Sequence, residues 1–388
     1  MMKEILKKQK EILESKNTRS IRELYDIDIQ GFGVGIAPES YLKKLNLTGL
    51  DGYDNETSQN YGNYVDSQGN IFVFIPKFYY KIESNDFYLS SQKRKGYVIH
   101  RAFINSGKEI DGFFIGKYSF GDGNVKSLKS KQPYSFITIN TALQKIKALN
   151  SNYTISNAFM YSAIAMISKF QQQFFTKDFC SYVDNICKFP KGNNVSGVDN
   201  FDKSVSFTRY AQLTLTGSGV PFSKTTHNGQ DSGVADINGN VWEFSIGLTC
   251  FNNSFYYLNE DVDLNTLDNS NFMDLKNYTK FDYKVSASQG NFVGNGNNQV
   301  FGFSNDRNSR EYILTSCGLP LESGISTKGS WNYGNNKIFN VDKKVNNLIM
   351  LVGGNFSNGG YAGVWCRNLG YSNTISHLGI SGRLAIIP

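Results

Sequence analysis

The first strong hydrophobic pattern along the chain predicts β-strands. Residues 71–82, with the sequence IFVFIPKFYYKI, are apolar or aromatic at almost every position and predict a strand. Residues 97–100 and 113–118 are shorter runs of the same character and predict two more. The first third of the chain is therefore expected to contribute to a buried sheet.

Apolar residues recur with helical spacing in two later segments. Residues 138–149 are apolar at 139, 142, 143 and 146, and residues 156–175 are apolar at 159, 163, 164, 167 and 170. This spacing places the apolar side chains on one face of a helix. Ser156 is the predicted N-cap of the second helix, because a serine hydroxyl accepts a hydrogen bond from the first helical turn.

The N-terminal residues predict a helix of a different kind. Residues 3–25 are rich in Lys, Glu, Gln and Leu and contain neither Pro nor Gly. Ile5 and Ile12, like Leu6 and Leu13, are seven residues apart, which fits either a short coiled coil or a helix docked on its own domain. The glycine-rich residues 31–38 predict a connector, and residues 40–70 are polar and rich in turn-forming residues.

From residue 180 onward the pattern changes to short strands between turns rich in Gly, Asn and Ser. Residues 250–310 and 322–347 are long, Asn-rich stretches that are expected to be inserts in this β-rich half. Helices followed by a β-rich half predict an α+β fold of irregular character. The expected organisation is an N-terminal helix for oligomerisation or attachment (1–30), a connector or small N-terminal subdomain (31–69) and one large domain (70–388).

Composition and charge narrow the classes of function. With 40% hydrophobic and 19% charged residues the chain is expected to be globular. Its 23 Tyr and 29 Phe, with many Asn, Ser and Gly, fit an adaptable binding surface, and they fit an AT-rich genome equally well. The net charge of +7 is spread thinly. The densest basic run, residues 93–95, is interpreted as a solvated turn, so no nucleic-acid partner is expected.

Two further patterns concern membranes. No apolar stretch approaches the roughly 20 residues that a membrane-spanning helix needs, so no membrane insertion is expected. Residues 1–16 are charged throughout and lack the apolar segment of a signal peptide. We therefore expect the protein to fold and assemble in a bacterial cytoplasm.

Side chains that bind metals or carry out catalysis are few and scattered. The three histidines, at 100, 227 and 377, are far apart in the sequence. The five cysteines, at 180, 187, 250, 317 and 366, are odd in number and are expected to be reduced thiols. The chain shows no zinc-type spacing, EF-hand loop or nucleophile-elbow motif. The sequence therefore predicts no metal, no cofactor and no catalytic residues.

Two segments stand out as motifs. Residues 233–244, GVADINGNVWEF, place a tight turn before Trp242. Residues 351–377, LVGGNFSNGGYAGVWCRNLGYSNTISH, mix aromatic rings with small polar residues and one arginine, a composition typical of binding hot spots. The alternative interpretation is that these rings are core residues of the last strands.

These segments resemble the C-type-lectin-like fold shared with the formylglycine-generating enzymes. The resemblance rests on residues 236–243 (DINGNVWE), the later Gly-Gly turn, the final Gly-Arg strand, and the upstream segments 74–78 (FIPKF) and 111–118 (DGFFIGKY). Residues 353–365, GGNFSNGGYAGVW, resemble the variable region of proteins diversified by retroelements. That family includes a phage tail-tip receptor-binding protein. In this family an error-prone reverse transcriptase replaces residues on a rigid scaffold.

The resemblance and the residue types together indicate a ligand-binding region at 353–377, supported by a scaffold. Phe356 stands where the family commonly has Trp, and residues 380–383 match its usual ending only loosely. The expected ligand-binding residues are Asn355, Ser357, Asn358, Tyr361, Trp365, Arg367, Tyr371, Asn373, Ser376 and His377. The expected scaffold residues are Trp242, Gly353, Gly354, Gly363 and Arg383.

The resulting expectation is a non-enzymatic receptor-binding protein of a phage tail tip or fibre, located in the virion. Its expected partners are a host-surface protein or glycan, other tail or baseplate proteins through the N-terminal region, and further copies of itself in a homotrimer. A formylglycine-generating-type oxidoreductase is one alternative, but it would need a second cysteine close to Cys366. A lectin or adhesin on the bacterial cell surface is the other. A calcium-dependent lectin would need a Glu-Pro-Asn or Gln-Pro-Asp motif, which the chain lacks.

Overall fold

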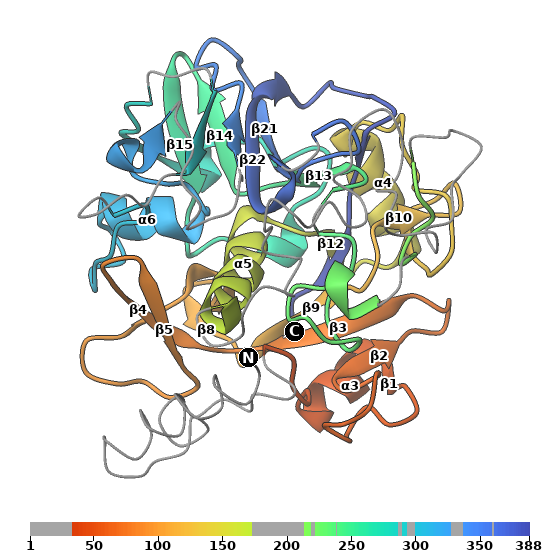
Figure 1. Ribbon diagram of the computed structural model, residues 1–388. Helices are drawn as coiled ribbons and strands as arrows, with labels where there is room; N and C mark the ends of the chain where they lie inside the picture. Colours follow the sequence, from red (N-terminus) through yellow and green to blue (C-terminus); the bar gives the residue numbers. More distant parts are fainter. Residues whose placement is uncertain are drawn as a thin grey trace, which may run out of the picture.

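The computed structural model describes residues 33–172, 213–218, 222–237, 239–285, 289–292, 299–326, 337–358 and 361–388 (Figure 1). The helix expected at 3–25, the whole 1–30 segment, Cys180 and Cys187 lie outside these ranges. The described part is a mixed structure in which β-sheets predominate and helices are few, which agrees with the α+β class.

The two helices predicted in the interior are present. Helix α4 (Ile139–Leu149) buries Ile139, Ala142, Leu143 and Ile146, and the Thr138 side chain caps it by accepting a hydrogen bond from the Thr141 amide. Helix α5 spans Ala158–Gln172. The prediction of Ser156 as its N-cap is wrong, because the Asn157 Oδ1 accepts the hydrogen bond from the Met160 amide, at 2.9 Å.

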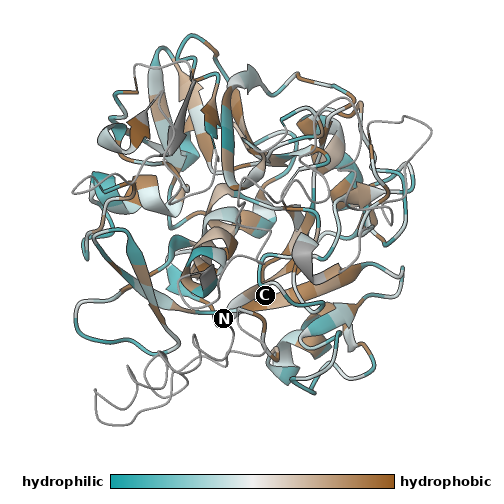
Figure 2. Ribbon diagram, viewed as in Figure 1, coloured by the Kyte–Doolittle hydropathy of each residue, from teal (hydrophilic) through white to brown (hydrophobic). Residues whose placement is uncertain are grey.

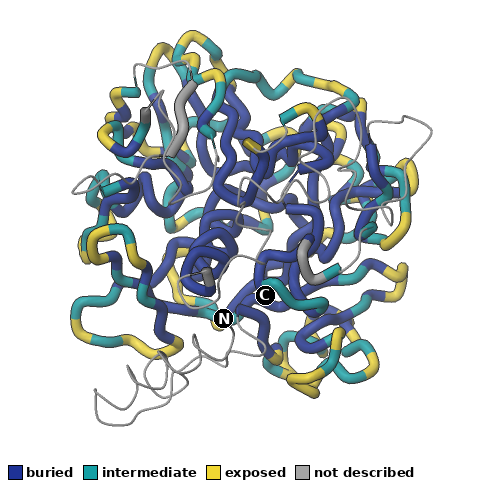
Figure 3. The backbone as a smooth tube through the Cα atoms, in the orientation of Figure 1, coloured by how far each residue is buried: buried dark blue, intermediate teal, exposed yellow. Residues whose placement is uncertain are grey.

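Helix α5 lies at the centre of the molecule. Its residues are buried on every side from Ala158 to Gln171, and it contacts β5, β22 and α6. Figure 3 shows it as a fully buried tube near the middle of the view. A helix that is apolar all round needs such a position, because no face of it can remain in water. The shorter helices of the described part are α3 (Glu39–Leu45) and α6 (Arg310–Ser316).

One antiparallel sheet joins the beginning and the end of the described chain. Its strand order within the described residues is β1-β2-β3-β9-β24-β12. Its strands are β1 (Thr48–Gly49), β2 (Asn63–Val65), β3 (Ile71–Pro76), β9 (Gly112–Gly116), β24 (Leu384–Ile386) and β12 (Tyr153–Ile155). Within the segment 31–69, for which a connector or small N-terminal subdomain was expected, β1 and β2 belong to this main sheet. Tyr64 is fully buried in the common core.

The strand predicted over 71–82 is two strands in two sheets. Strand β3 ends at Pro76, and β4 (Tyr79–Glu83) pairs instead with β5 (Asp86–Ser90) and β6 (Val98–Ile99). Proline has no amide hydrogen to donate to a continuing ladder, so a strand commonly ends or changes direction there. The continuous hydrophobic run gives no sign of this change.

The second large sheet carries the region of interest. Its strand order in the described ranges is β18-β17-β20-β22-β21-β13-β23, with β20 parallel to β22 and β13 parallel to β23. Its strands are β18 (Ile325–Ser326), β17 (Gln289–Phe292), β20 (Lys337–Phe339), β22 (Gly363–Ser372), β21 (Leu348–Gly353), β13 (Trp242–Ser245) and β23 (Ile380–Ser381). Strand β22 thus lies inside the sheet, between β20 and β21.

The stretches expected to be inserts contribute to the core. Phe255, Leu258, Phe272 and Tyr312 from the 250–310 region and its continuation are buried in the same hydrophobic cluster as the two large sheets. Figure 2 shows hydrophobic residues running through α5 and β3. The smaller sheets of the described part contain β14 (Leu248–Phe251), β15 (Ser254–Leu258) and β16 (Tyr278–Phe281), and the hairpins β7 (Ile104–Asn105) with β8 (Lys108–Glu109) and β10 (Phe120–Gly121) with β11 (Lys126–Ser127).

None of the helices within the described ranges is long and apolar enough to cross a bilayer.

Candidate functional site

The chain leaves β21 through a tight turn before it enters β22. Gly353 and Gly354 have φ angles of 88° and 82°, in the left-handed region that favours glycine. A Cβ added to Gly354 would lie 2.7 Å from the Cβ of Ala362, so a larger residue cannot fit there. Gly353, Gly354 and Gly363 are all buried at the base of this turn.

Asparagine side chains hold the turn together. The Asn355 amide donates to Asn358 Oδ1 at 2.7 Å, and the Ser357 hydroxyl donates to Asn355 Oδ1 at 2.7 Å. Asn355 is only 7% exposed. It therefore forms the floor of the turn instead of facing solvent, which corrects its predicted role, while Ser357 is exposed and Asn358 is half-buried.

Tyr361 is the aromatic residue of this turn that reaches solvent. Its backbone amide donates to the Asn358 carbonyl at 3.0 Å, and its side chain is 40% exposed. The Lys337 ammonium, from β20, lies 3.5 Å from the centre of its ring. A cation over an aromatic face is an attractive pair that fixes the orientation of the ring. No local sequence pattern pointed to Lys337, because Lys337 and Tyr361 are distant in the chain.

A second aromatic side chain is exposed close to this turn. Phe136 is 60% exposed and has a φ of 56°, which is unusual for a bulky residue. Its amide donates to the His377 carbonyl at 3.2 Å, and His377 Nδ1 accepts from the Gly379 amide at 3.0 Å. Gly379 packs directly beneath Asn355, since an added Cβ would lie 2.4 Å from Asn355 Nδ2.

We use the name turn face for the exposed side chains that these contacts connect, partly through the buried residues Asn355 and Gly379. A series of contacts links Phe136 through His377 and Gly379 to the 355–358 turn and then to Tyr361. The turn face consists of Ser357, Asn358, Tyr361, Lys337, His377 and Phe136, with Asn355 as its floor. Phe136 had no signal in the sequence, because it precedes a helix in an otherwise unremarkable polar segment.

Tyr371 and Asn373 lie at the other end of the β21–β22 ladder. Tyr371 pairs with Ile349, and the Asn373 amide donates to the Asn347 carbonyl, whereas Gly363 pairs with Gly353 beside the turn. On β21, four steps of the strand separate Ile349 from Gly353, a distance of roughly 14 Å. The Tyr371 and Asn373 side chains are half-buried, and Ser376 is exposed in the segment that leads back to His377. The expected contiguous set is therefore split in two.

Trp365 is a core residue, which corrects its predicted place in the ligand-binding set. Its side chain has no exposed surface and lies against the rings of Phe301 and Phe87, with centroid distances of 4.5 and 5.8 Å. Strand β22 is covered by neighbouring strands on both edges and by α5. The alternative interpretation of the motif, that its rings are core residues, is thus right for this residue.

Arg367 is also buried, with no exposed surface, so its predicted contact with a ligand is wrong as well. Its guanidinium donates to the carbonyls of Val364, Cys366 and Cys317, at 2.8, 3.1 and 3.4 Å. Burial lowers the pKa of this guanidinium to about 10. Arg367 fastens β22 to the segment after α6 through main-chain acceptors.

Beneath the turn face, a buried ion pair joins the two large sheets. Arg383 donates to both carboxylate oxygens of Glu243, at 2.6 and 2.8 Å, and to the carbonyls of Gly116, Lys117 and Ala235. Burial raises the pKa of the Glu243 carboxyl, and the Arg383 charge acts against that rise. Trp242, 4% exposed, packs edge-to-face on Phe339.

The cysteine thiols within the described residues are buried, and so are His100 and His227. Burial raises the pKa of the Cys317 and Cys366 thiols to about 12, so thiolate is scarce at neutral pH. Burial lowers the pKa of His100 and of His227 to about 3. Within the described ranges, no three His, Cys, Asp or Glu side chains converge in a way that could hold a metal ion.

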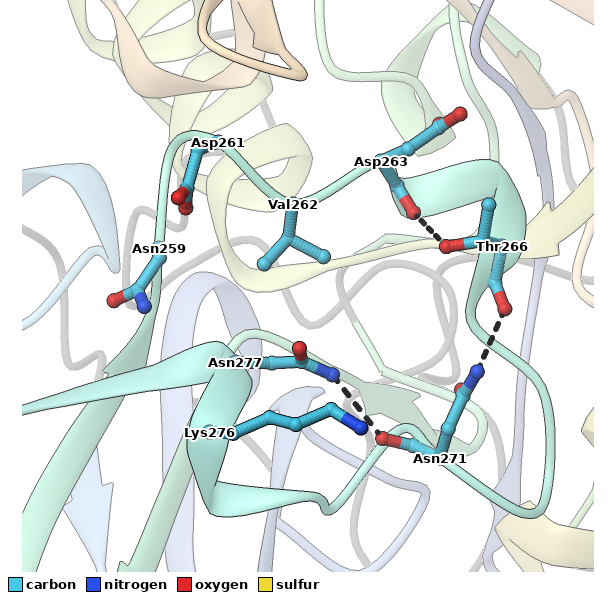
Figure 4. Close-up of a pocket in the computed structure, with 8 residues that line it drawn as sticks. All are labelled: Asn259, Asp261, Val262, Asp263, Thr266, Asn271, Lys276 and Asn277. Atoms are coloured by element: carbon cyan, nitrogen blue, oxygen red, sulfur yellow. Dashed lines mark hydrogen bonds between the residues drawn. The ribbon is translucent and has the colours of Figure 1, made fainter.

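A polar cavity of about 340 Å³ lies apart from the turn face, between β15, β16 and the loop that connects them (Figure 4). Several of its lining groups already bond one another. Thr266 Oγ1 donates to the Asp263 carbonyl, and Asn271 Nδ2 donates to the Thr266 carbonyl. Figure 4 shows these side chains engaged along the wall of the cavity. They do not form a convergent set of free groups, so the cavity is a weaker candidate than the turn face.

No known protein family matches the chain, and no curated protein matches it in sequence.

Proposed function

We propose that this chain is a non-enzymatic receptor-binding protein that recognises a host-surface protein or glycan through the turn face. The proposal places it at a phage tail tip or fibre, within the family of retroelement-diversified C-type-lectin-like proteins that its motifs resemble. The observation that carries it is the exposure of two aromatic side chains, Phe136 and Tyr361, in segments that hydrogen bonds and packing contacts connect.

Three large hydrophobic side chains in the described part of the chain are exposed: Ile36, Phe136 and Tyr361. Two of them, Phe136 and Tyr361, belong to the turn face. Exposed aromatic residues contribute most of the energy in many interfaces, and the Ser, Asn, Lys and His residues around them supply hydrogen bonds. An aromatic side chain exposed to water gives the isolated chain little hydrophobic stabilisation, so a partner that covers Phe136 and Tyr361 would explain their exposure.

The frame beneath the face favours recognition over chemistry. Buried β22, the Arg383–Glu243 pair and the glycine turn hold the exposed side chains on a rigid base, so little order must be created on binding. Four side chains with nucleophilic or metal-binding chemistry are buried and are not exposed on the turn face: Cys317, Cys366, His100 and His227. The histidine that the turn face exposes is His377.

The direct test uses fluorescently labelled protein and a panel of bacterial strains. Tyr361→Ala and Phe136→Ala should each reduce binding to the strain that the wild-type protein labels. Ile36→Ala is the matched control, because Ile36 is 49% exposed but does not belong to the turn face. The proposal fails if wild-type protein labels no strain, or if the three variants bind equally well.

Pretreatment of the cells separates the two receptor classes. Protease treatment should abolish binding to a protein receptor, and periodate oxidation should abolish binding to a glycan. A reverse-transcriptase gene and a near-copy of the sequence encoding 353–377 beside this gene would support membership of the retroelement family. Their absence would count against that part of the proposal.

The proposal includes a homotrimer, because several copies of a weak site on one particle give strong total attachment. Light scattering of the full chain at micromolar concentration tests it. A monomer mass would contradict the trimer but would not bear on binding through the turn face.

A further inference from the structure

Lys117 is a buried lysine whose amine faces a side-chain amide. It follows β9 and is 4% exposed. Its Nζ donates to Asn63 Oδ1 at 2.6 Å and to the Asp231 carbonyl at 2.7 Å. Two carbonyl oxygens thus hold the buried amine in place.

The Asn63 side chain is fixed with its carbonyl towards that amine. Asn63 is the first residue of β2 and has no exposed surface. Its Nδ2 donates to the carbonyls of Tyr61 and Ser232, each at 2.8 Å. Both amide hydrogens are therefore engaged, and Oδ1 is the atom that points at Lys117.

The surroundings of the pair exclude water. The Phe222 ring lies 5.5 Å from Lys117 Nζ and favours the charged amine. Burial nevertheless lowers the pKa of Lys117 to about 7, against the opposing effect of the Asp231 charge. A substantial fraction of the amine is neutral at neutral pH, and a neutral amine has the lone pair that a nucleophile needs.

We propose that Lys117 and Asn63 form an intramolecular isopeptide bond. The Nζ lone pair attacks Cγ of Asn63, a new Nζ–Cγ bond forms, and the Cγ–Nδ2 bond breaks. One Nζ proton moves to Nδ2, which leaves as ammonia. The reaction needs no oxidant and no other reactant. The Asp231 backbone carbonyl, which accepts a hydrogen bond from Nζ at 2.7 Å, holds the amine beside Asn63.

The bond would join two strands that are not neighbours. β2 and β9 both pair with β3, on opposite edges, so the crosslink would pass over β3 and close a ring from residue 63 to residue 117. A covalent tie of this kind limits how far the sheet can open, because the unfolded chain keeps the ring. The inference is independent of the turn face and of its partner.

The decisive experiment is the intact mass of the purified wild-type chain, followed by mapping of its proteolytic peptides. We expect a mass about 17 Da below that of the sequence, the loss of one ammonia, and a branched peptide that joins residues 63 and 117. The full sequence mass would overturn the proposal. So would a deficit that maps to another asparagine, such as a succinimide at Asn228, which precedes Gly229.

Variants test the two partners. Lys117→Met should restore the full mass, and Asn63→Asp should yield the same crosslinked product by loss of water. Lys129→Met is the matched control, since Lys129 lies over the same Phe222 ring, 5.1 Å from its centre, and should keep the deficit. The wild-type mass decides the main proposal even if a variant fails to fold.

Discussion

The Lys337 ammonium lies 3.5 Å from the centre of the Tyr361 ring. Tyr361 is exposed, whereas Trp365 and Arg367 of the same motif are buried in the core. We expect Tyr361→Ala to weaken receptor binding by about 1–4 kcal/mol, because exposed aromatic anchors contribute that much in other interfaces. The melting temperature should barely change, since the ring is 40% exposed.

Lys337→Met tests whether the Lys337 charge contributes to receptor binding through its contact with the Tyr361 ring. It keeps the aliphatic length of the side chain and removes the charge. A double-mutant cycle with Tyr361→Ala should give a coupling of about 0.5–1 kcal/mol, the usual size for an exposed cation–π pair. Additive effects on binding would show that the two residues act separately.

We expect Phe136 to lower the folding stability of the protein while it contributes to receptor binding. A left-handed φ costs a residue with a Cβ roughly 1–2 kcal/mol, and glycine escapes this cost. We therefore expect Phe136→Gly to unfold at a higher urea concentration than Phe136→Ala, while both bind the receptor equally poorly. Equal urea midpoints would mean that the backbone at Phe136 is not strained.

Trp365→Ala should behave in the opposite way to Tyr361→Ala. Removing a fully buried indole costs roughly 3–5 kcal/mol of folding free energy, because a cavity remains among Phe87 and Phe301. Binding by the fraction that stays folded should be unchanged. Urea unfolding and binding of the same samples check this. A Trp365→Ala variant that stays stable but no longer binds the receptor would instead assign Trp365 to the ligand-binding residues.

The buried histidines predict a loss of stability in acid. Burial lowers the pKa of both His100 and His227 to about 3, with smaller contributions from the charges of Arg101 and Arg383. The unfolded chain takes up protons near pH 6.5 and the folded chain does not. Stability is therefore complete above about 6.5 and falls as the pH drops towards 3, by about 1.4 kcal/mol per pH unit for each histidine.

Urea unfolding between pH 7 and pH 5 measures this slope. His227→Asn should reduce the slope even if it lowers the stability at pH 7. A flat wild-type profile between pH 6 and pH 5 would contradict the assignment.

The sequence predicted the positions of the helical segments better than it predicted which strands pair in each sheet. The spacing of apolar residues found α4 and α5, because a period of 3.6 is a strong local signal. It could not place β1 and β2 in the main sheet, since the residues that pair with them are distant in the chain. Nor could it divide 71–82 between two sheets, because both halves are equally hydrophobic.

The candidate site was found as a region and misjudged at single residues. The glycines at 353 and 354 marked the turn, but aromatic and polar residues alternate similarly in an exposed loop and in an interior strand. Only the pairing of β22 on both edges shows that Trp365 and Arg367 are inside. Lys337 and Phe136 reach the turn face from elsewhere in the sequence, so no local pattern could include them.

Strand β24 lies between β9 and β12, in the interior of the first sheet. A ribosome completes residues 353–377 before it makes β24, so a growing chain carries the turn face before that sheet can close. A chain interrupted between the two would leave β9 and β12 with unpaired edges, open to aggregation and proteolysis. A frameshift within residues 353–377 would remove β24, so the first sheet of such a chain would stay open and the chain would be cleared before it reached the native state.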